Sequence, residues 1–227
     1  MNSMFDTLKT LPLFKGVSDD QMSEVVGKTR FHFFKYLPDT EFIREGDPCT
    51  AFNFILDGAV KISVFNSDKR FKVTQVLRAP DVIFPDFMFG RYTDCPGNVT
   101  SVETTKILQV SKSDYLNILS QDSVFLINYL NMLSLNGQKS FGGVLALTTG
   151  SIEERIAFWV VALTQSSATD ITIECRQRDL YSVFGVQRTS FIAALESMKT
   201  RGLIDFMPDR IIIKSRRAMV DVLKRIP

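Results

Sequence analysis

Short apolar runs separated by turn-forming residues fill the chain between Phe31 and Val110. The runs are rich in Phe, Ile and Val. Turn signals such as Glu45-Gly46-Asp47-Pro48, Asp57-Gly58 and Cys95-Pro96-Gly97-Asn98 follow one another at intervals of about 8–15 residues. That spacing is typical of antiparallel strands that close into a barrel or roll. We therefore expect an N-terminal antiparallel β-roll of the double-stranded β-helix or jelly-roll type, preceded by a helix over residues 5–28.

A stretch of about 27 residues without proline, Asp122 to about Thr148, follows the roll. It predicts one long helix, after a short helix over residues 111–120. Its apolar residues are spread too broadly for one face, so we expect it to pack on the roll and on the same helix of a second copy. The alternative is a long core helix without a partner. The residues expected at the dimer interface are Ile127, Leu130, Leu133, Phe141 and Val144.

The C-terminal segment combines two helical patterns with two short strands. An extended piece precedes one helix that runs to Phe184 and a second that starts near Gln187, and Gly185 lies between them, where a positive φ costs little. Two strands, residues 203–206 and 210–214, then meet at a turn. This arrangement is a winged helix-turn-helix. The sequence therefore predicts an α+β protein with a roll-shaped sensor domain (residues 1–121), a long dimerisation helix and hinge (122–149) and a winged helix-turn-helix DNA-binding domain (150–227).

The second of these helices begins with four consecutive polar side chains, and a helix cap would use only one of them. Apolar residues at helical spacing, Phe191, Leu195 and Met198, hold the helix on its domain. From Ser151 onward the chain has 12 Lys and Arg against 9 Asp and Glu, a net charge of +3, while the first 150 residues carry −1. Residues at this end of a helix-turn-helix face base edges in the major groove. We therefore expect DNA contacts from Gln187, Arg188, Thr189 and Ser190.

Three segments of the sequence together resemble one family: LPLFKGVSDDQM, FIREGDPCTAFNFILDGAVKIS and QRDLYSVFGVQRTSF with LESMKTRGLI. They are similar, in this order, to the opening helix, the core roll motif and the helix-turn-helix of the Crp/Fnr transcription regulators. The resemblance implies a cyclic-nucleotide-binding-like roll and a dimer that reads a two-fold operator. It adds Gln177 as a DNA-binding position, with Arg176 and Arg201 as phosphate contacts. It makes Arg188 the retained base reader, suited to guanine, whereas Ala193 replaces the family's second Arg.

The segment FPDFMFGRYTDCPGNVTSV departs from the nucleotide-binding members of that family. Pro85-Asp86 stands where a Gly-Glu pair is expected, and Pro96-Gly97 stands about where an Arg-Ser pair would hold the cyclic phosphate. A buried phosphate without a cation is costly, so we do not expect cyclic AMP or cyclic GMP to bind unless Arg91 substitutes. A different effector, no effector and a simple filled core stay open. The candidate effector pocket consists of Asp86, Phe87, Met88, Arg91, Asn98, Val99 and Ser140.

Residues that could hold a metal or cofactor are few. His32 is the single histidine, and the cysteines Cys49, Cys95 and Cys175 lie far apart in the sequence without a CxxC pair. We therefore expect no metal site, no haem on His32 and no iron–sulfur cluster, which needs four thiolates. Free cysteines fit a cytoplasmic protein. The sequence has neither a secretory signal nor an apolar run of about 18 residues, so we expect no membrane span.

These features together favour a cytoplasmic, homodimeric transcription regulator that binds double-stranded DNA. An enzyme is not expected, because the sequence offers no paired carboxylates, nucleophile–base set or phosphate loop. RNA polymerase is an expected partner if the protein is an activator. The effector, a small molecule or a redox signal, is not identified by the sequence. Two alternatives stay open: a winged domain that binds a protein instead of DNA, and a constitutive regulator that needs no effector.

Overall fold

The computed structural model describes residues 4–223, except for the side chains of residues 4, 5, 139, 140 and 142–149. The chain forms two compact units. One combines Met1–Lys61 with Arg78–Leu135, and the other combines Ile62–Leu77 with Asn136–Pro227. The sequence-based boundaries after residues 121 and 149 stay a prediction.

The first unit begins with short helices. α1 (Met4–Thr10) is followed by the 3₁₀ turn η1 (Pro12–Phe14) and by α2 (Asp19–Lys28). Ser18 and Gln21 form a capping box at the start of α2. The expectation of one helix over residues 5–28 is wrong. Pro12 opens a new turn because it lacks an N–H to continue α1, and Gly16 has a φ of +79° that ends the turn.

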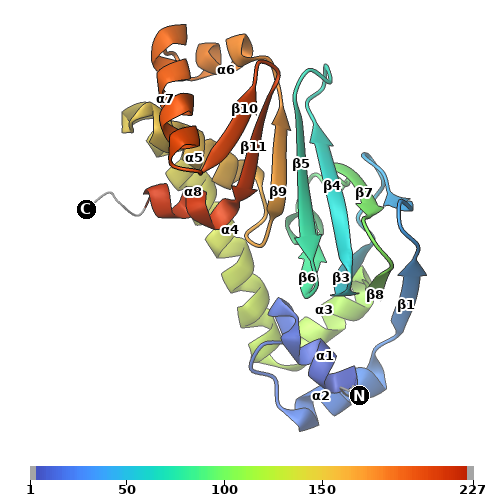
Figure 1. Cartoon of the computed structure of the whole chain (residues 1–227). Helices are drawn as coiled ribbons and strands as arrows, with labels where there is room; N and C mark the ends of the chain where they lie inside the picture. The colour runs from blue at the N-terminus through green and yellow to red at the C-terminus, as the bar shows by residue number, and fades with distance from the viewer. Residues whose placement is uncertain (1–3, 224–227) are drawn as a thin grey trace. The chain divides into compact units, whose positions relative to one another are not determined.

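The roll of the first unit is antiparallel, as predicted. β1 (Phe31–Tyr36), β8 (Thr105–Ser111), β3 (Ala51–Asp57) and β6 (Asp81–Ile83) form a sheet in that order, and β2 (Glu41–Ile43) pairs with β7 (Gly97–Ser101). Figure 1 shows α1 and α2 beside one end of these strands. Buried Phe52, Phe54 and Leu108 form much of the core. At Gly58, φ is +84° and a Cβ would lie 2.6 Å from the carbonyl oxygen of Thr104, so the turn requires glycine.

Two helices follow the roll where the sequence predicts them. Ser111 caps α3 (Lys112–Gln121) by accepting a hydrogen bond from the N–H of Asp114, and α4 (Ser123–Thr149) is the long helix. In the first unit, the side-chain amide of Asn128 donates to the carbonyl oxygen of Lys15 at 2.8 Å. This bond ties the first half of α4 to the N-terminal helices.

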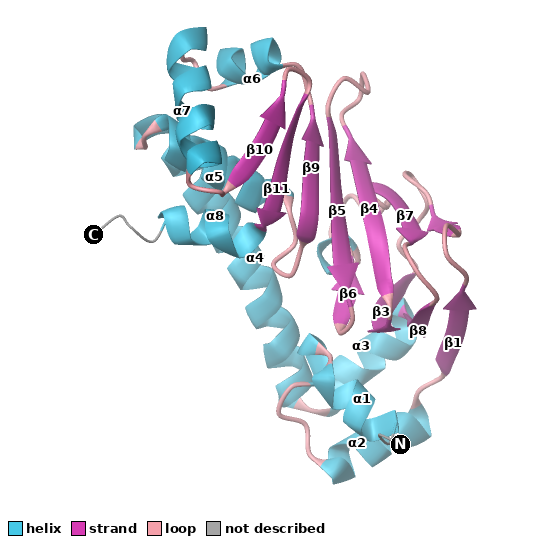
Figure 2. Cartoon of the chain, in the orientation of Figure 1, coloured by secondary structure: helices cyan, strands magenta, loops and turns pink. Residues whose placement is uncertain are grey.

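The second unit contains the elements of the predicted winged helix-turn-helix. They are α5 (Ile152–Leu163), β9 (Thr169–Glu174), α6 (Gln177–Val183), α7 (Arg188–Thr200), β10 (Ile204–Met207), β11 (Arg210–Ser215) and α8 (Arg216–Leu223). Ser151 and Glu154 form a capping box at the start of α5, and Gly185 has a φ of +63° between α6 and α7. Figure 2 shows α5 and α8 on one side of the β9–β11 sheet. The sequence did not predict α8.

A hairpin from the roll segment of the sequence belongs to this second unit. It contains the end of β4 (Ala59–Phe65) and most of β5 (Lys72–Arg78), and the strand order in the unit is β10-β11-β9-β5-β4. β5 pairs antiparallel with β9, with Val73 opposite Ile173. The ring of Phe71 lies 5.2 Å from that of Trp159 on α5. The edge of the winged domain's sheet is therefore covered by a segment about 100 residues earlier in the chain.

Candidate nucleic-acid interface and effector region

The start of α7 presents a row of polar side chains outside the core. Phe191, Leu195 and Met198 are fully buried and fix the helix on its unit. The four preceding side chains are exposed, and within the described part of the chain they form no hydrogen bond or ion pair: Gln187, Arg188, Thr189 and Ser190. Gln187 occupies the N-cap position but its side chain does not cap the helix. These groups are thus left free to bond to another molecule.

The other three predicted DNA contacts already have partners in the chain. The guanidinium of Arg176 pairs with Asp179 at 3.0 Å, and the amide of Gln177 donates to the carbonyl oxygen of Met207 at 3.1 Å. Arg201 forms an ion pair with Glu153. Arg201 also lies at the opposite end of α7 from Arg188, about 20 Å away at 1.5 Å per residue. The structure therefore does not bring Arg201 to the polar start of the helix.

A basic group in the second unit was missed by the sequence analysis. A cleft of about 210 Å³ is lined by the hairpin and by the start of α6. Its walls are Phe65, Lys69, Arg70, Lys72, Glu174, Cys175, Arg176 and Asp209. Lys72 and Glu174 form an ion pair at 3.1 Å across 102 positions of sequence. Because the strand pairing alone brings these cations beside Arg176, no local motif could have revealed the cluster.

One cation of the basic C-terminal segment is not available to a partner. Arg216 is 5% exposed, and its guanidinium donates to the hydroxyl of Thr164 at 3.2 Å and to the carbonyl oxygen of Val161 at 3.0 Å. Burial lowers the pKa of Arg216 from its ordinary value. The net charge of +3 counted from Ser151 onward therefore includes one positive charge that does not lie at the surface.

The described candidate effector residues differ widely in exposure, and none of them lines either of the two clefts described in this section. Met88 and Val99 are buried in the core, whereas Asp86 and Arg91 are exposed. The guanidinium of Arg91 lies 5.6 Å from the ring centre of Tyr92. Phe87, in the 3₁₀ turn η2 (Pro85–Phe87), is half-buried, and the side-chain oxygen of Asn98 accepts a hydrogen bond from the N–H of Glu45 at 2.8 Å. The side chain of Ser140 lies outside the described residues.

Aromatic side chains fill the space behind this segment. The rings of Phe52 and Tyr115 are 3.9 Å apart, and Tyr129 packs edge-on against Phe52 and Phe89. The hydroxyl of Tyr129 donates to the carbonyl oxygen of Pro85 at 3.3 Å, and burial raises the pKa of Tyr129 to about 12. Of the alternatives that the sequence left open for this segment, the packing favours a filled core.

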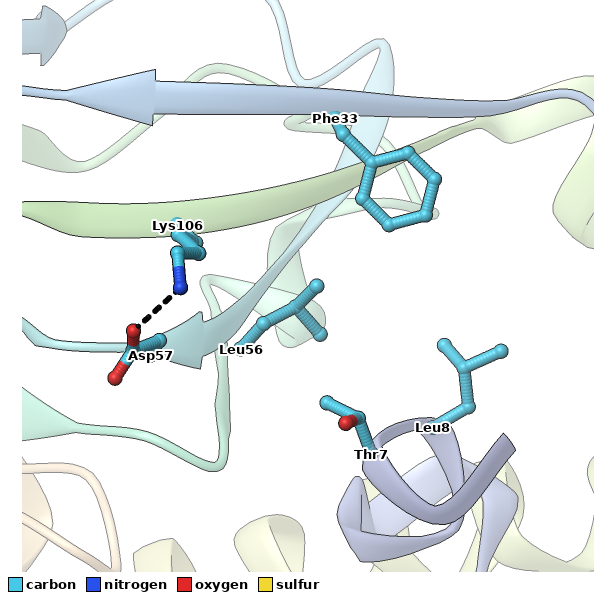
Figure 3. A pocket seen from close by; sticks show the side chains of 6 residues that line it. All are labelled: Thr7, Leu8, Phe33, Leu56, Asp57 and Lys106. Atoms are coloured by element: carbon cyan, nitrogen blue, oxygen red, sulfur yellow. Dashed lines mark hydrogen bonds and ion pairs between the residues drawn. The ribbon is translucent and has the colours of Figure 1, made fainter. Parts of the chain in front are cut away.

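The first unit has a cleft of about 350 Å³ at another place (Figure 3). It is lined by Thr7, Leu8, Phe33, Leu56, Asp57 and Lys106. The ammonium of Lys106 pairs with the carboxylate of Asp57 at 2.9 Å and holds the pKa of that carboxyl below its ordinary value. None of the candidate effector residues whose side chains the structure describes lines this cleft. Its polar groups are already paired, so it offers mainly an apolar wall.

The first half of α4 has an apolar face that the described residues leave open. Phe125 and Tyr129 point into the first unit and are buried, but Leu126, Ile127 and Leu130 are 40%, 52% and 46% exposed. Of the other residues predicted at a dimer interface, Leu133 is half-buried and Phe141 is 69% exposed. The side chain of Val144 lies outside the described residues. Contiguous exposed apolar side chains of this kind mark interaction surfaces.

No group of three or more His, Cys, Asp or Glu side chains that could hold a metal ion occurs within the described residues. His32, considered for haem, lies exposed on β1. None of the helices in the described part of the chain is long and apolar enough to cross a membrane.

Comparisons with known proteins agree with this architecture. Residues 33–122 match the family model described as the cyclic nucleotide-binding domain. A search of the curated proteins finds no match. The catabolite activator protein of Thermus thermophilus is 15% identical, with 95% of this chain and 100% of that chain covered and a TM-score of 0.54.

Two further solved structures are similar over part or most of the chain. The sensor domain of the transcriptional regulator DNR from Pseudomonas aeruginosa is 21% identical over 57% of this chain and 85% of that chain, with a TM-score of 0.49. The c-di-GMP-responsive global regulator CLP of Xanthomonas campestris is 15% identical over 87% of this chain and 100% of that chain, with a TM-score of 0.48. The family-model match and the likeness to the catabolite activator protein confirm the predicted resemblance and the predicted fold class: residues 33–122 match the cyclic nucleotide-binding domain, and the chain shares the fold of that catabolite activator protein.

Proposed function

We propose that the protein is a sequence-specific DNA-binding transcription regulator that acts as a homodimer in the cytoplasm. The observation that carries the proposal is the start of α7, where exposed Gln187, Arg188, Thr189 and Ser190 have no partner within the described residues. Unused hydrogen-bonding groups at the N-terminus of the second helix suit base edges in the major groove. Regulation, and not catalysis, is therefore the proposed role.

Each part of this interface has a separate task in the proposal. Arg188 reads a base by two parallel hydrogen bonds to guanine. Its side chain is long, its guanidinium is planar, and it has no ion-pair partner within the described residues. Gln187, Thr189 and Ser190 adjust to bases or phosphates. Arg176 and Arg201 give up weak surface ion pairs for phosphate contacts, at little cost because such pairs contribute ~0–1 kcal/mol. Gln177 holds the wing through Met207 and contacts the backbone of DNA beside it.

Dimerisation places two copies of α7 on one operator. The exposed apolar face of α4 around Ile127 and Leu130 supports a second copy as the partner of this helix. Two recognition helices then read half-sites about one turn of DNA, ~34 Å, apart. If the protein activates transcription, RNA polymerase is its further partner.

We propose that the roll is the input domain but does not use a cyclic nucleotide. Pro85-Asp86 and Pro96-Gly97 provide no cation for a phosphate, and Arg91 is exposed beside Tyr92. β4 offers a covalent route for a signal, because its first residues belong to the roll and its last belong to the unit that carries α7. A shift in β4 or β5 would reach the winged domain through the pairing with β9.

Selection from a random library of duplex DNA tests the proposal. The full chain is incubated with the library at low and moderate salt, and the bound fraction is sequenced over several rounds. We expect enrichment of an inverted repeat whose half-sites are about one turn apart, with affinity that falls steeply as salt rises. Salt-sensitive binding without sequence enrichment would contradict sequence-specific recognition. No DNA binding at all would favour the alternative in which the winged domain binds a protein.

A further inference from the structure

Two of the three cysteines meet in the first unit. Cys49 and Cys95 are 46 positions apart in the sequence, but their Sγ atoms lie 3.2 Å apart and both are free thiols. The two cysteines are thus distant in the sequence but adjacent in the fold. Sequence spacing could not indicate it, because the contact arises from two loops of the roll.

Main-chain hydrogen bonds hold the two cysteine loops together on both sides of the pair. The N–H of Cys49 donates to the carbonyl oxygen of Thr93 at 2.7 Å, and the N–H of Cys95 donates to that of Asp47 at 2.8 Å. The N–H of Gly46 donates to the carbonyl oxygen of Cys95 at 2.9 Å. Pro48 also forms an isolated β-bridge with Asp94. The fold itself therefore keeps the two sulfur atoms in contact.

The two thiols are not equivalent. The hydrogen bond from Cys95 lowers the pKa of Cys49 from its ordinary value, helped by the charge of Lys112 and opposed by burial and by Asp94. The same hydrogen bond, with burial, raises the pKa of Cys95. Cys49 is therefore the more nucleophilic sulfur, and Cys95 the proton donor beside it. The two residues are only 8% and 7% exposed, so a small reagent has access that a protein would not have.

We propose that Cys49 and Cys95 form a redox-modification site that a hydroperoxide converts to an intramolecular disulfide. The sulfur of Cys49 attacks the terminal peroxide oxygen and the O–O bond breaks. The leaving oxygen takes a proton and departs as an alcohol, or as water from hydrogen peroxide. Cys95 then loses its proton and attacks the sulfenic sulfur of Cys49, and the S–O bond breaks to release water. Two thiols are oxidised and one peroxide is reduced by two electrons.

The geometry demands little movement for this reaction. A disulfide bond is about 2.04 Å long, so the sulfur atoms must approach by about 1 Å. Cys95 directly precedes Pro96-Gly97, the positions where the resemblance places the phosphate-holding pair. Oxidation would thus join the candidate effector segment covalently to the loop after β2. This site goes beyond the proposed DNA-binding function and does not depend on it.

Cys175 provides an internal comparison. It lies in the second unit, its thiol donates to the carbonyl oxygen of Arg176 at 3.5 Å, and burial raises its pKa. Without a neighbouring thiol in the described structure and without a lowered pKa, it should react slowly. The Cys175→Ser variant leaves the proposed pair intact and serves as the working background.

Thiol counting with peptide mass spectrometry tests the site. The reduced full chain is exposed to a small excess of hydrogen peroxide, alkylated, denatured and digested. We expect wild type to fall from three thiols to one and Cys175→Ser from two to none, with one peptide pair cross-linked between Cys49 and Cys95 and released by dithiothreitol. Cys95→Ser should stop at a sulfenic acid on Cys49, trapped by dimedone, and Cys49→Ser should react at least tenfold more slowly.

Two results would overturn the proposal. One is that Cys49 and Cys95 keep their thiols under conditions in which Cys175 is oxidised. The other is a cross-link that joins two chains or includes Cys175. If Cys49→Ser or Cys95→Ser fails to fold, the thiol counts of wild type and of Cys175→Ser still test the proposal, because both proteins retain the pair.

Discussion

The polar side chains at the start of α7 and those in the segment from Pro85 to Asn98 differ in whether they already have partners. At the start of α7, four polar side chains are exposed and have no partner within the described residues. In the roll segment, the corresponding groups are already used: Asn98 bonds to the backbone of Glu45, Arg91 lies beside Tyr92, and Cys95 contacts Cys49. Phe52, Tyr115 and Tyr129 fill the space behind it.

This difference indicates which kind of partner each region can accept. An exposed guanidinium can bond to a new acceptor without first losing one, so α7 suits a charged polymer such as DNA. A packed segment must break contacts to admit a ligand, and the cation of this segment, Arg91, is exposed beside Tyr92. It can instead respond by chemistry within its own side chains. The predictions below separate these two behaviours.

Disruption of the α4 interface should have the largest effect, because it removes the second recognition helix from the operator. We expect Ile127→Glu with Leu130→Glu to raise the dimer dissociation constant by about a thousandfold or more, since four buried apolar contacts per dimer would cost roughly 4 kcal/mol or more. Sedimentation equilibrium measures the change. Both side chains are about half exposed in the single chain, so the variant should fold.

Asn131→Glu is the matched control for this variant. Asn131 is exposed on the same helix directly after Leu130, and its substitution adds one negative charge per chain, against two in the double variant, without removing an apolar side chain. It should stay dimeric. If the double variant dimerises as wild type does, the subunit interface lies elsewhere and the open face of α4 has another occupant.

Oxidation of the thiol pair should stabilise the roll. The disulfide would close a loop of 46 positions, and the loop-entropy relation gives between about 3 and 4.7 kcal/mol for loops of 15 to 100 residues. Urea unfolding of the Cys175→Ser chain, with and without peroxide, measures the difference. The same chain with Cys49→Ser added should gain nothing from peroxide. An oxidised chain less stable than the reduced one would mean that the disulfide strains the loops.

The addition of cyclic AMP should have the smallest effect of these experiments, because we expect no binding. Calorimetric titration of the reduced dimer with cyclic AMP should give no binding heat at micromolar concentrations, because Pro96 and Gly97 offer no charge to the phosphate. Cyclic GMP should behave in the same way. Micromolar binding of either nucleotide would refute the contrast between the two regions, and Arg91→Ala would then test whether this exposed cation had moved to the phosphate.

Much of the fold could be predicted because its signals are local. The capping boxes at Ser18 and Ser151, the left-handed turn at Gly185 and the long helix after Asp122 each depend on residues a few positions apart. The polar start of α7 is also local, since it is visible as four polar residues before Phe191. Local hydrogen bonding and helical periodicity were sufficient for these elements.

The remaining features depend on contacts between distant segments. Three contacts join residues at least 46 positions apart: the pairing of β5 with β9, the contact of Cys49 with Cys95 and the hydrogen bond from Arg216 to the carbonyl oxygen of Val161. Periodicity carries no information on which strand edge a hairpin will cover, or on which loops a roll will bring together. Arg201 illustrates the same limit, because its ion pair with Glu153 joins residues 48 positions apart in the sequence.

The base preference of Arg188 variants tests the central claim most directly. Wild type, Arg188→Ala, Arg188→Lys and Arg176→Ala are titrated against the enriched operator and against all single-base variants of one half-site, at two salt concentrations. A bidentate Arg–guanine contact contributes about 1–3 kcal/mol of discrimination. We expect Arg188→Ala to lose that amount on the preferred site and to flatten the preference at one base pair per half-site. Arg188→Lys should keep the charge but also lose the preference, because it lacks the planar fork.

Arg176→Ala supplies the contrast within the same measurement. It should weaken all sequences alike and reduce the slope of affinity against salt by about one per contact in each half-site. Our account predicts that both Arg188 variants change the base preference. A change of salt concentration alone should leave the base preference of the wild-type protein as it is. The contradicting result is an Arg188→Ala protein that binds every sequence more weakly by the same factor, since Arg188 would then be a phosphate anchor and the start of α7 would not read bases through it.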